Sequence, residues 1–395
     1  MSPCLSAAKS GFILCLMSLA PLLLAGCSAM KSDELSGTQL SSVYPKPKKI
    51  KLQSKAEEKA ATRKVALLLP LSGEHAELGQ TMKNAAELSL FENADDHLEL
   101  LLKDTKGTAE GAVLAVQGAL KQGAKLVLGP VFAYEVRAVL PEAQARHVPV
   151  ISFSSDQNVA GRGGYVLGFS PREQIKRIVT FAKSRGVDRL AVLAPSTPYG
   201  SLVTSALSAL AAEGETTVVA SLSYTGRGEN LADDLQKWRS LSFNGLLLPV
   251  GGDELRILIA NLQAFGFDFS KVRLLGTGVW DTAEMHAVPL LTGGWYASVD
   301  PSERTSFESH FRESYGTLPK RIATLAYDAV SLAAVLSQSR TPHPFHQKTL
   351  TQPRGFAGVD GLFRLKAQGT TERSLAVLEI TAEGSRVISP AQNHF

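Results

Sequence analysis

Several polar side chains follow directly on short apolar segments, and these are the residues best suited to hold a ligand. Ser154, Ser155 and Asp156 come after the apolar residues 148–152 and combine two hydroxyls with a carboxylate. In open α/β sheets, ligands bind beyond the carboxyl ends of the strands. The predicted ligand-binding residues are Ser72, Ser154, Ser155, Asp156, Tyr199 and Trp280. The alternative for the serines and the aspartate is turn and helix-capping chemistry, which favours the same residue types.

Motifs that would support catalysis are absent from the sequence. Neither the Gly-x-Ser-x-Gly turn of hydrolases nor the Gly-x-x-x-x-Gly-Lys-[Ser/Thr] phosphate loop occurs. His343 and His346 are three residues apart, but Pro342 and Pro344 flank the first of them, so the two imidazoles cannot share one face of a helix. We therefore predict no enzymatic activity, no metal site and no cofactor.

The N-terminal segment has the features of a lipoprotein leader. Lys9 precedes an apolar run over residues 11–24, which is shorter than the roughly 20 residues that a membrane-spanning helix needs. The run ends in Leu-Ala-Gly-Cys at 24–27, which is similar to a bacterial lipobox. This similarity predicts that residues 1–26 are removed and that the Cys27 thiol receives a fatty acyl chain such as palmitate, which anchors the protein to a membrane. The alternatives are an uncleaved anchor or an ordinary signal peptide.

Two further features bear on the anchor. Lipoproteins that stay at the inner membrane often carry aspartate directly after the acylated cysteine, so Ser28 favours the outer membrane. Residues 27–62 contain many Ser and Lys, with two Pro and one Gly, and show no apolar periodicity, which predicts a flexible basic tether. Its clustered lysines either keep the tether soluble and extended or contact anionic lipid or cell wall.

The composition is that of a folded protein with a nearly neutral body. The chain has 395 residues, of which 44% are hydrophobic and 20% charged, enough for two domains of ordinary size. The formal net charge is +4. Because much of the basic excess lies in the first 64 residues, the body offers no basic face large enough for nucleic acid.

From residue 64 onwards, apolar strands alternate with amphipathic helices. This alternation predicts an α/β fold with parallel sheets covered on both faces. A first series has predicted strands at 64–69, 98–102, 125–128 and 148–152, and a second has strands at 190–194, 217–221, 245–250 and 272–275. In the tail we expect a strand at 295–298, helices at 301–315 and 322–337, a loop at 341–354, and an antiparallel pair formed by 361–365 and 374–380.

The body resembles the type I periplasmic binding proteins of the leucine/isoleucine/valine-binding family. The residues that carry this resemblance are Val65–Gly73, Leu78-Gly79, Leu128-Gly129-Pro130, Val148–Ser152 and Pro198-Tyr199-Gly200, and the match covers about residues 63–385. The resemblance implies two doubly wound lobes that exchange segments through a hinge. It places 63–169 and 300–350 in lobe one, and 170–299 and 351–388 in lobe two.

One subgroup of that family is more similar still. The lipobox, the tether and the tail segments Gly358–Arg364 and Arg373–Leu378 resemble the penicillin-binding-protein activators. This resemblance implies a non-enzymatic lipoprotein that regulates peptidoglycan synthesis by contact with a peptidoglycan synthase. The alternative is the substrate-binding subunit of an ABC importer for amino acids or related small molecules, with an ABC permease as partner and a ligand between the lobes.

Three positions depart from an amino-acid receptor of this family. The hydroxyl expected for the ligand carboxylate is replaced at Ala133, the acid expected for the ligand ammonium falls near Gly278, and an expected aromatic residue is Leu78. Burying an unpaired ammonium group costs several kcal/mol. Ordinary branched-chain amino-acid binding is therefore not expected unless Asp156 or Asp281 supplies the missing carboxylate.

Overall fold

The computed structural model describes residues 62–93, 97–226, 231–238, 240–339 and 341–395. The predicted signal peptide, Cys27 and the tether up to residue 61 lie outside these ranges. Within them, no helix is both long and apolar enough to cross a membrane.

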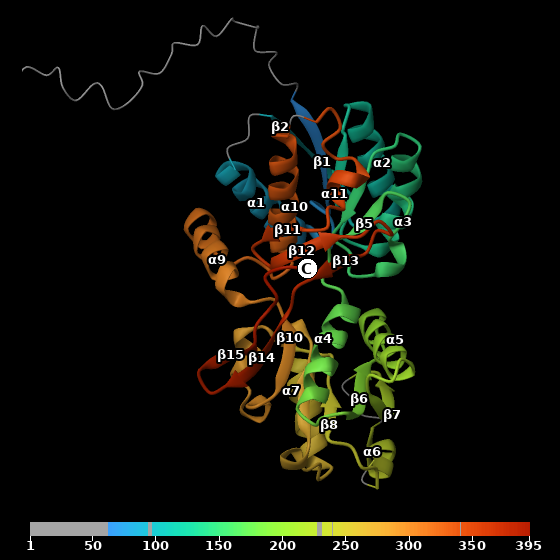
Figure 1. The fold of residues 1–395 in the computed structure, drawn as a ribbon, viewed down its shortest axis with the longest axis vertical. Coiled ribbons are helices and arrows are strands. Elements are labelled where there is room, and N and C mark those ends of the chain that lie inside the picture. The colour runs from blue at the N-terminus through green and yellow to red at the C-terminus, as the bar shows by residue number, and fades with distance from the viewer. Residues whose placement is uncertain (1–61, 94–96, 227–230, 239, 340) are drawn as a thin grey trace, which may run out of the picture. The chain divides into compact units, whose positions relative to one another are not determined.

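Lobe one is built on a five-stranded parallel sheet with the strand order β2-β1-β3-β4-β5. Its strands are β1 (Arg63–Leu69), β2 (Leu98–Asp104), β3 (Leu126–Leu128), β4 (Val150–Ser152) and β5 (Gly164–Val166). The helices between them are α1 (Ala76–Asn93), α2 (Ala109–Lys121) and α3 (Ala133–Gln144), with the short 3₁₀ turn η1 (Gln157–Val159). Figure 1 shows α1 on one face of this sheet and α2 and α3 on the other.

The apolar run of β1 explains why both faces are covered. Val65, Leu67 and Leu69 belong to the core that contains α1, whereas Ala66 and Leu68 belong to the core that contains α2 and α3. Successive side chains of a strand point to opposite faces, so a strand that is apolar at every position needs a helical layer on each side.

Lobe two contains a seven-stranded sheet with the order β15-β14-β10-β9-β8-β6-β7. Its parallel strands are β6 (Arg189–Pro195), β7 (Thr217–Tyr224), β8 (Gly245–Leu247), β9 (Arg273–Gly276) and β10 (Trp295–Ser298). Two antiparallel strands, β14 (Ala376–Thr381) and β15 (Gly384–Ser389), complete it.

Helices again cover both faces of this sheet. One face packs on α4 (Pro171–Ser184) and α5 (Pro198–Ala212), and the other on α6 (Ala232–Trp238) and α7 (Gly252–Ala264). The short turn η2 (Phe269–Lys271) precedes β9. After β9, the turn η3 (Gly278–Trp280), the one-turn helix α8 (Ala283–His286) and the turn η4 (Pro289–Leu291) lead to β10. The start of α4 agrees with its sequence, because Ser170 caps the Glu173 amide and Pro171 occupies the first turn.

After β10 the chain returns to lobe one. Helix α9 (Pro301–Tyr315) buries Phe307 and Phe311 against Ala85 and Leu88 of α1. Helix α10 (Ala323–Ser337) then packs along α1 in the lobe-one core, and α11 (Gln347–Leu350) follows. A small antiparallel sheet of β11 (Phe356–Gly358), β12 (Gly361–Leu365) and β13 (Thr371–Arg373) also lies against lobe one (Figure 1).

The tail differs from the sequence-based prediction in three ways. Residues 361–365 pair with β11 and β13 and not with the strand at 376–381, which belongs to the lobe-two sheet. The lobe boundary predicted at residue 350 lies after β13, because Phe363 and Leu365 are buried in the lobe-one core and the Val166 amide donates to the Gly369 carbonyl. The predicted loop at 341–354 contains α11.

The predicted elements of the body are present with shifted ends, and β5 was missed. This strand is only three residues long and follows the glycine-rich residues 161–164, which sequence alone suggests are a surface turn. Its pairing with β4 over Val150 and Ser152 is what makes it a strand.

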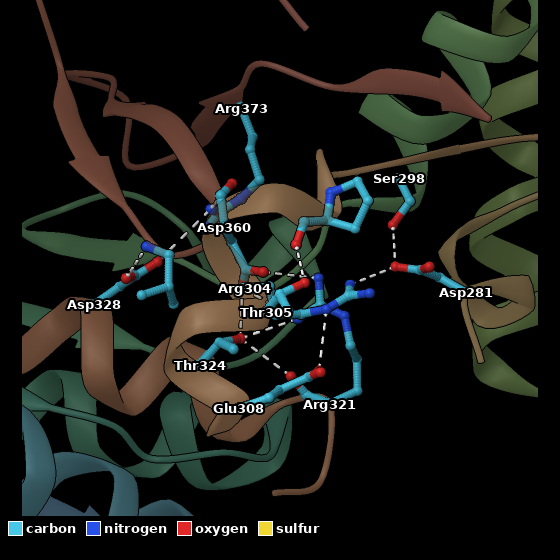
Figure 2. Close-up of polar contacts among 12 residues, drawn as sticks. Asp281, Ser298, Arg304, Thr305, Glu308, Arg321, Thr324, Asp328, Asp360 and Arg373 are labelled. Atoms are coloured by element: carbon cyan, nitrogen blue, oxygen red, sulfur yellow. Dashed lines mark hydrogen bonds and ion pairs between the residues drawn. The ribbon is translucent and has the colours of Figure 1, made fainter. Parts of the chain in front are cut away.

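A buried ion pair joins the two lobes near one of the segments that connect them. Arg304, on α9 of lobe one, contacts Asp281, just after η3 of lobe two, with 2.5 Å between Nη1 and Oδ2. Ser298 also donates to this carboxylate at 3.0 Å, and Glu308 holds the other side of the guanidinium (Figure 2). Burial raises the pKa of Asp281, but the hydrogen bond and charge of Arg304 outweigh this effect, so the pKa lies below its usual value.

A second group of buried charges fixes the small sheet onto lobe one. Asp360, between β11 and β12, forms a two-point ion pair with Arg321, while Arg373 donates to the Asp360 carbonyl at 3.0 Å. Asp328 of α10 accepts from the Val359 amide at 2.8 Å and lies 4.0 Å from Arg373 (Figure 2). Complete burial and the nearby charge of Asp360 raise the pKa of Asp328 to about 7.

We predict that Arg304→Ala destabilises the protein by about 3–5 kcal/mol, because it leaves the Asp281 carboxylate buried without its counter-charge. The matched control is Arg386→Ala, which removes an ion pair to Glu379 whose arginine side chain is 68% exposed and should cost about 0–1 kcal/mol. Urea unfolding of both variants measures the difference, and equal losses would contradict the role given to the interlobe pair.

Asp328 should make stability depend on pH. Its folded pKa of about 7 exceeds the usual 3.8, so between these values the folded protein holds a proton that the unfolded chain releases. The free energy of unfolding should therefore fall as pH rises through this window. Asp328→Asn keeps the acceptor for Val359 but cannot titrate, so it should flatten this fall. Urea unfolding at pH 4.5, 5.5 and 7 measures it, with Asp253→Asn at an exposed site as control. An unchanged profile in Asp328→Asn would show that another group is responsible.

Candidate functional site

A cavity of about 790 Å³ lies between the lobes, with residues of both in its wall. Lobe one contributes the segment after β3, the segment after β4 and the start of α10. Lobe two contributes the first turns of α4 and α5 and the segment after β9. The cavity therefore lies where the carboxyl ends of parallel strands from both sheets face each other, which is the usual ligand position in such folds. Its size falls within the roughly 300–1,000 Å³ of small-molecule sites.

Four of the six predicted ligand-binding residues line this cavity. Ser154, Ser155 and Asp156 lie together after β4, and Tyr199 lies opposite them in the first turn of α5. Ser154 accepts from the Asp156 amide at 3.1 Å, and Asp156 caps η1 by accepting from the Asn158 amide at 3.0 Å. Ser154 and Asp156 therefore both stabilise the turn after β4 and line the cavity.

The other two predicted residues lie outside the wall. Ser72 donates to Asp104 at 2.6 Å, which closes the turn after β1. Trp280 is completely buried in the lobe-two core, where its indole N–H donates to the Val250 carbonyl at 3.0 Å. Both residues follow strands as expected, but the Ser72 hydroxyl is used in a turn at the surface and the Trp280 indole N–H is used in the core.

Tyr199 is held in place by one hydrogen bond. Its hydroxyl lies 2.8 Å from the Thr277 hydroxyl after β9. Burial raises the pKa of Tyr199 to about 12, so the phenol remains neutral at physiological pH. The residue therefore contributes a neutral aromatic surface to the cavity.

All three positions that depart from an amino-acid receptor lie in the cavity wall, namely Leu78, Ala133 and Gly278. Asp281, one of the two proposed substitutes for the missing acid, is not in the wall because it pairs with Arg304. The other, Asp156, is paired with Arg137 at 2.8 Å. The wall of the described structure therefore contains no unpaired carboxylate.

Several residues of the wall were not predicted from the sequence. Phe153 directly follows β4, so the rule that ligands bind beyond the carboxyl ends of strands would also have predicted it. Gln174 is in the first turn of α4, where its side-chain oxygen accepts from the Gly278 amide at 2.7 Å. Phe169 and Arg321 are 152 positions apart, yet the Arg321 guanidinium lies 4.4 Å from the centre of the Phe169 ring. No local pattern signals such a contact, because it exists only when distant segments of the chain come together in the folded protein.

A buried carboxylate lies behind the lobe-one wall. Glu135 in the first turn of α3 is completely buried and accepts from the Phe132 amide at 3.1 Å. Burial raises its pKa above the usual value. The amides at the start of a helix can bind an anion, but the Phe132 amide is already hydrogen-bonded to Glu135. Elsewhere in the described ranges, no group of three or more His, Cys, Asp or Glu side chains is arranged to hold a metal ion.

Comparison with known proteins agrees with this geometry. A family model described as "Periplasmic binding protein" matches residues 62–385. A solved structure assigned to branched-chain amino acid ABC transport in Rhodospirillum rubrum superimposes with a TM-score of 0.72 at 19% identity, over 83% of this chain and 100% of that one. The branched-chain amino acid transporter substrate-binding protein LivJ of Streptococcus pneumoniae, in complex with isoleucine, gives a TM-score of 0.61 at 19% identity, over 83% and 100% of the two chains.

A relative in Rickettsia prowazekii (strain Madrid E), named only as an uncharacterized protein, is 24% identical over 144 residues. This match covers 36% of the present chain and 38% of the relative's length.

The family match bears on location and activity. It implies a periplasmic location, and it confirms the prediction of a binding protein without enzymatic activity. It also confirms the predicted α/β fold with two doubly wound lobes. The chain belongs to the periplasmic binding protein family and has the type I fold of its leucine/isoleucine/valine-binding members.

Proposed function

We propose that this protein is the solute-binding component of an ABC importer, which captures a small molecule between its lobes and presents it to a permease. The observation that carries this proposal is the cavity of about 790 Å³ whose wall is shared by both lobes. A ligand in that position touches both sheets at once, so its binding favours closure of one lobe onto the other.

The connections between the lobes support such a motion. The chain passes between the sheets after β5, after β10 and after β13, each time through a short segment. Few backbone torsions have to change for the lobes to rotate, as in hinge closure generally. The Arg304–Asp281 pair lies beside the second of these segments and limits where the rotation can occur.

A second candidate function is the regulation of peptidoglycan synthesis through contact with a peptidoglycan synthase. Its support is the resemblance of the lipobox, the tether and the tail segments to the penicillin-binding-protein activators, together with the missing carboxylate for a ligand ammonium. The tail segments in question form β11 to β13 and the start of β14. We rank this function second, because the cavity provides a direct place for a small ligand.

The partner distinguishes the two functions. We expect that the full chain, captured from a detergent extract of the cell envelope, brings down an ABC permease. The control is a variant in which Gly278→Trp fills the cavity, because a bulky ring there excludes ligand and should reduce recovery of the permease. Recovery of a peptidoglycan synthase in place of a permease, to the same extent with both proteins, would replace the first function by the second.

The membrane anchor is proposed to be an acyl group on Cys27. Cys27→Ala should abolish the acyl mass, because the thiol that carries the lipid is gone, and should leave the leader of residues 1–26 uncleaved. Cys15→Ala lies within the predicted signal peptide and should change neither property. Mass spectrometry measures both effects, and separation of inner from outer membranes checks the outer location that Ser28 favours. Acyl mass on the Cys27→Ala protein, or its absence from the unaltered mature protein, would refute the anchor.

A further inference from the structure

The charges in the wall of the interlobe cavity are already paired within the protein. Asp156 and Arg321 are the charged residues among its lining residues. Asp156 pairs with Arg137 at 2.8 Å and also accepts from the side chain of Asn158 at 2.8 Å. Arg321 contacts both oxygens of Asp360, at 2.8 and 3.2 Å, and covers the Phe169 ring. Neither residue is available as a counter-charge for a ligand.

Most uncharged polar groups of the wall are also engaged. Tyr199 bonds with Thr277, Thr197 accepts from the Gly200 amide, and Ser298 donates to Asp281. Among the described residues of the wall, Ser155 and Gln174 are different: the Ser155 hydroxyl has no partner within the protein, and Gln174 accepts from the Gly278 amide through its oxygen but has no partner for its amide nitrogen. This nitrogen, with the nearby hydroxyls of the wall, supplies donors but no charge.

The helix starts at the cavity do not compensate for missing cations. At α3, the buried Glu135 side chain accepts from the Phe132 amide, so this amide is not available to a ligand. At α5, Pro198 has no N–H, and Thr197 caps the Gly200 amide. The partial positive charge of both helix ends is therefore weakened or already used.

The rest of the wall is apolar. Three phenylalanines, Phe132, Phe153 and Phe169, face the cavity with aliphatic side chains from both lobes. Burying a charged group without a counter-charge in such surroundings costs several kcal/mol. We infer that the cavity takes an uncharged, mainly apolar ligand that offers a hydrogen-bond acceptor to Gln174, and not a zwitterionic amino acid. This inference rests on the proposed ligand-binding function and names the class of ligand.

The test compares ligands that share one carbon skeleton and differ in the charged and polar groups that they carry. For each of the leucine, phenylalanine and tryptophan skeletons, the amino acid, the deaminated acid and the amide of that acid are titrated into the full chain by calorimetry, with protein-free detergent as blank. We expect the amide to bind at least tenfold more tightly than the amino acid, and more tightly than the acid. Tightest binding of the amino acid or of the acid overturns the inference while leaving ligand binding intact. Absence of binding by all nine compounds overturns both the inference and the proposed function.

A substitution in the wall provides the converse test. A side chain at Gly278 would meet the Gln174 oxygen at 3.3 Å and the Ser298 hydroxyl at 3.6 Å, so a small residue fits there with little adjustment. Gly278→Asp introduces an unpaired carboxylate and should shift the preference toward the amino acid by about tenfold or more. Gly278→Asn has the same shape without the charge and should retain the preference for the amide. An equal response of the two variants would show that charge in the wall does not determine the choice.

Discussion

Charged groups can leave water only when they are paired, and this constraint governs the junction of the two lobes. Arg304 and Asp281 cross from one lobe to the other, and Arg321 with Asp360 ties the small three-stranded sheet to the start of α10. Each pair is buried or nearly so, and each replaces lost hydration by a short ionic contact. Because these contacts have fixed geometry, they determine where the connecting segments run and where the cavity wall ends.

Arg321 connects this junction to the ligand site. It belongs to the buried charge network and also lines the cavity, where it covers the Phe169 ring. Because its guanidinium is paired with both carboxylate oxygens of Asp360, its charge is not available to a ligand. The carboxylate of Asp156 is likewise not available to a ligand, because it pairs with Arg137 and caps η1. A wall assembled in this way selects ligands by shape and apolar contact more than by charge.

Proteins with very different sequences share this fold, whereas ligand specificity depends on individual residues of the cavity wall. Chains at 19% identity share the two-lobed arrangement over 83% of this chain. That arrangement depends on apolar strands and on helices that cover them, and many different side chains satisfy this requirement. The wall of the cavity depends on single residues, and Leu78, Ala133 and Gly278 differ there from what an amino-acid receptor needs. Fold and ligand choice therefore depend on different residues.

The sequence by itself determined the alternation of strands and helices, the capped start of α4 and the position of Ser154, Ser155, Asp156 and Tyr199 at strand or helix ends. These features depend on local periodicity and on neighbours within about four residues, which a sequence displays directly. Only the tertiary structure decided that β12 pairs with β11 and β13, that Trp280 points into the core, and that Phe169 and Arg321 meet at the cavity. These outcomes depend on which face of an element is buried and on contacts between residues far apart in the chain, and neither leaves a local pattern.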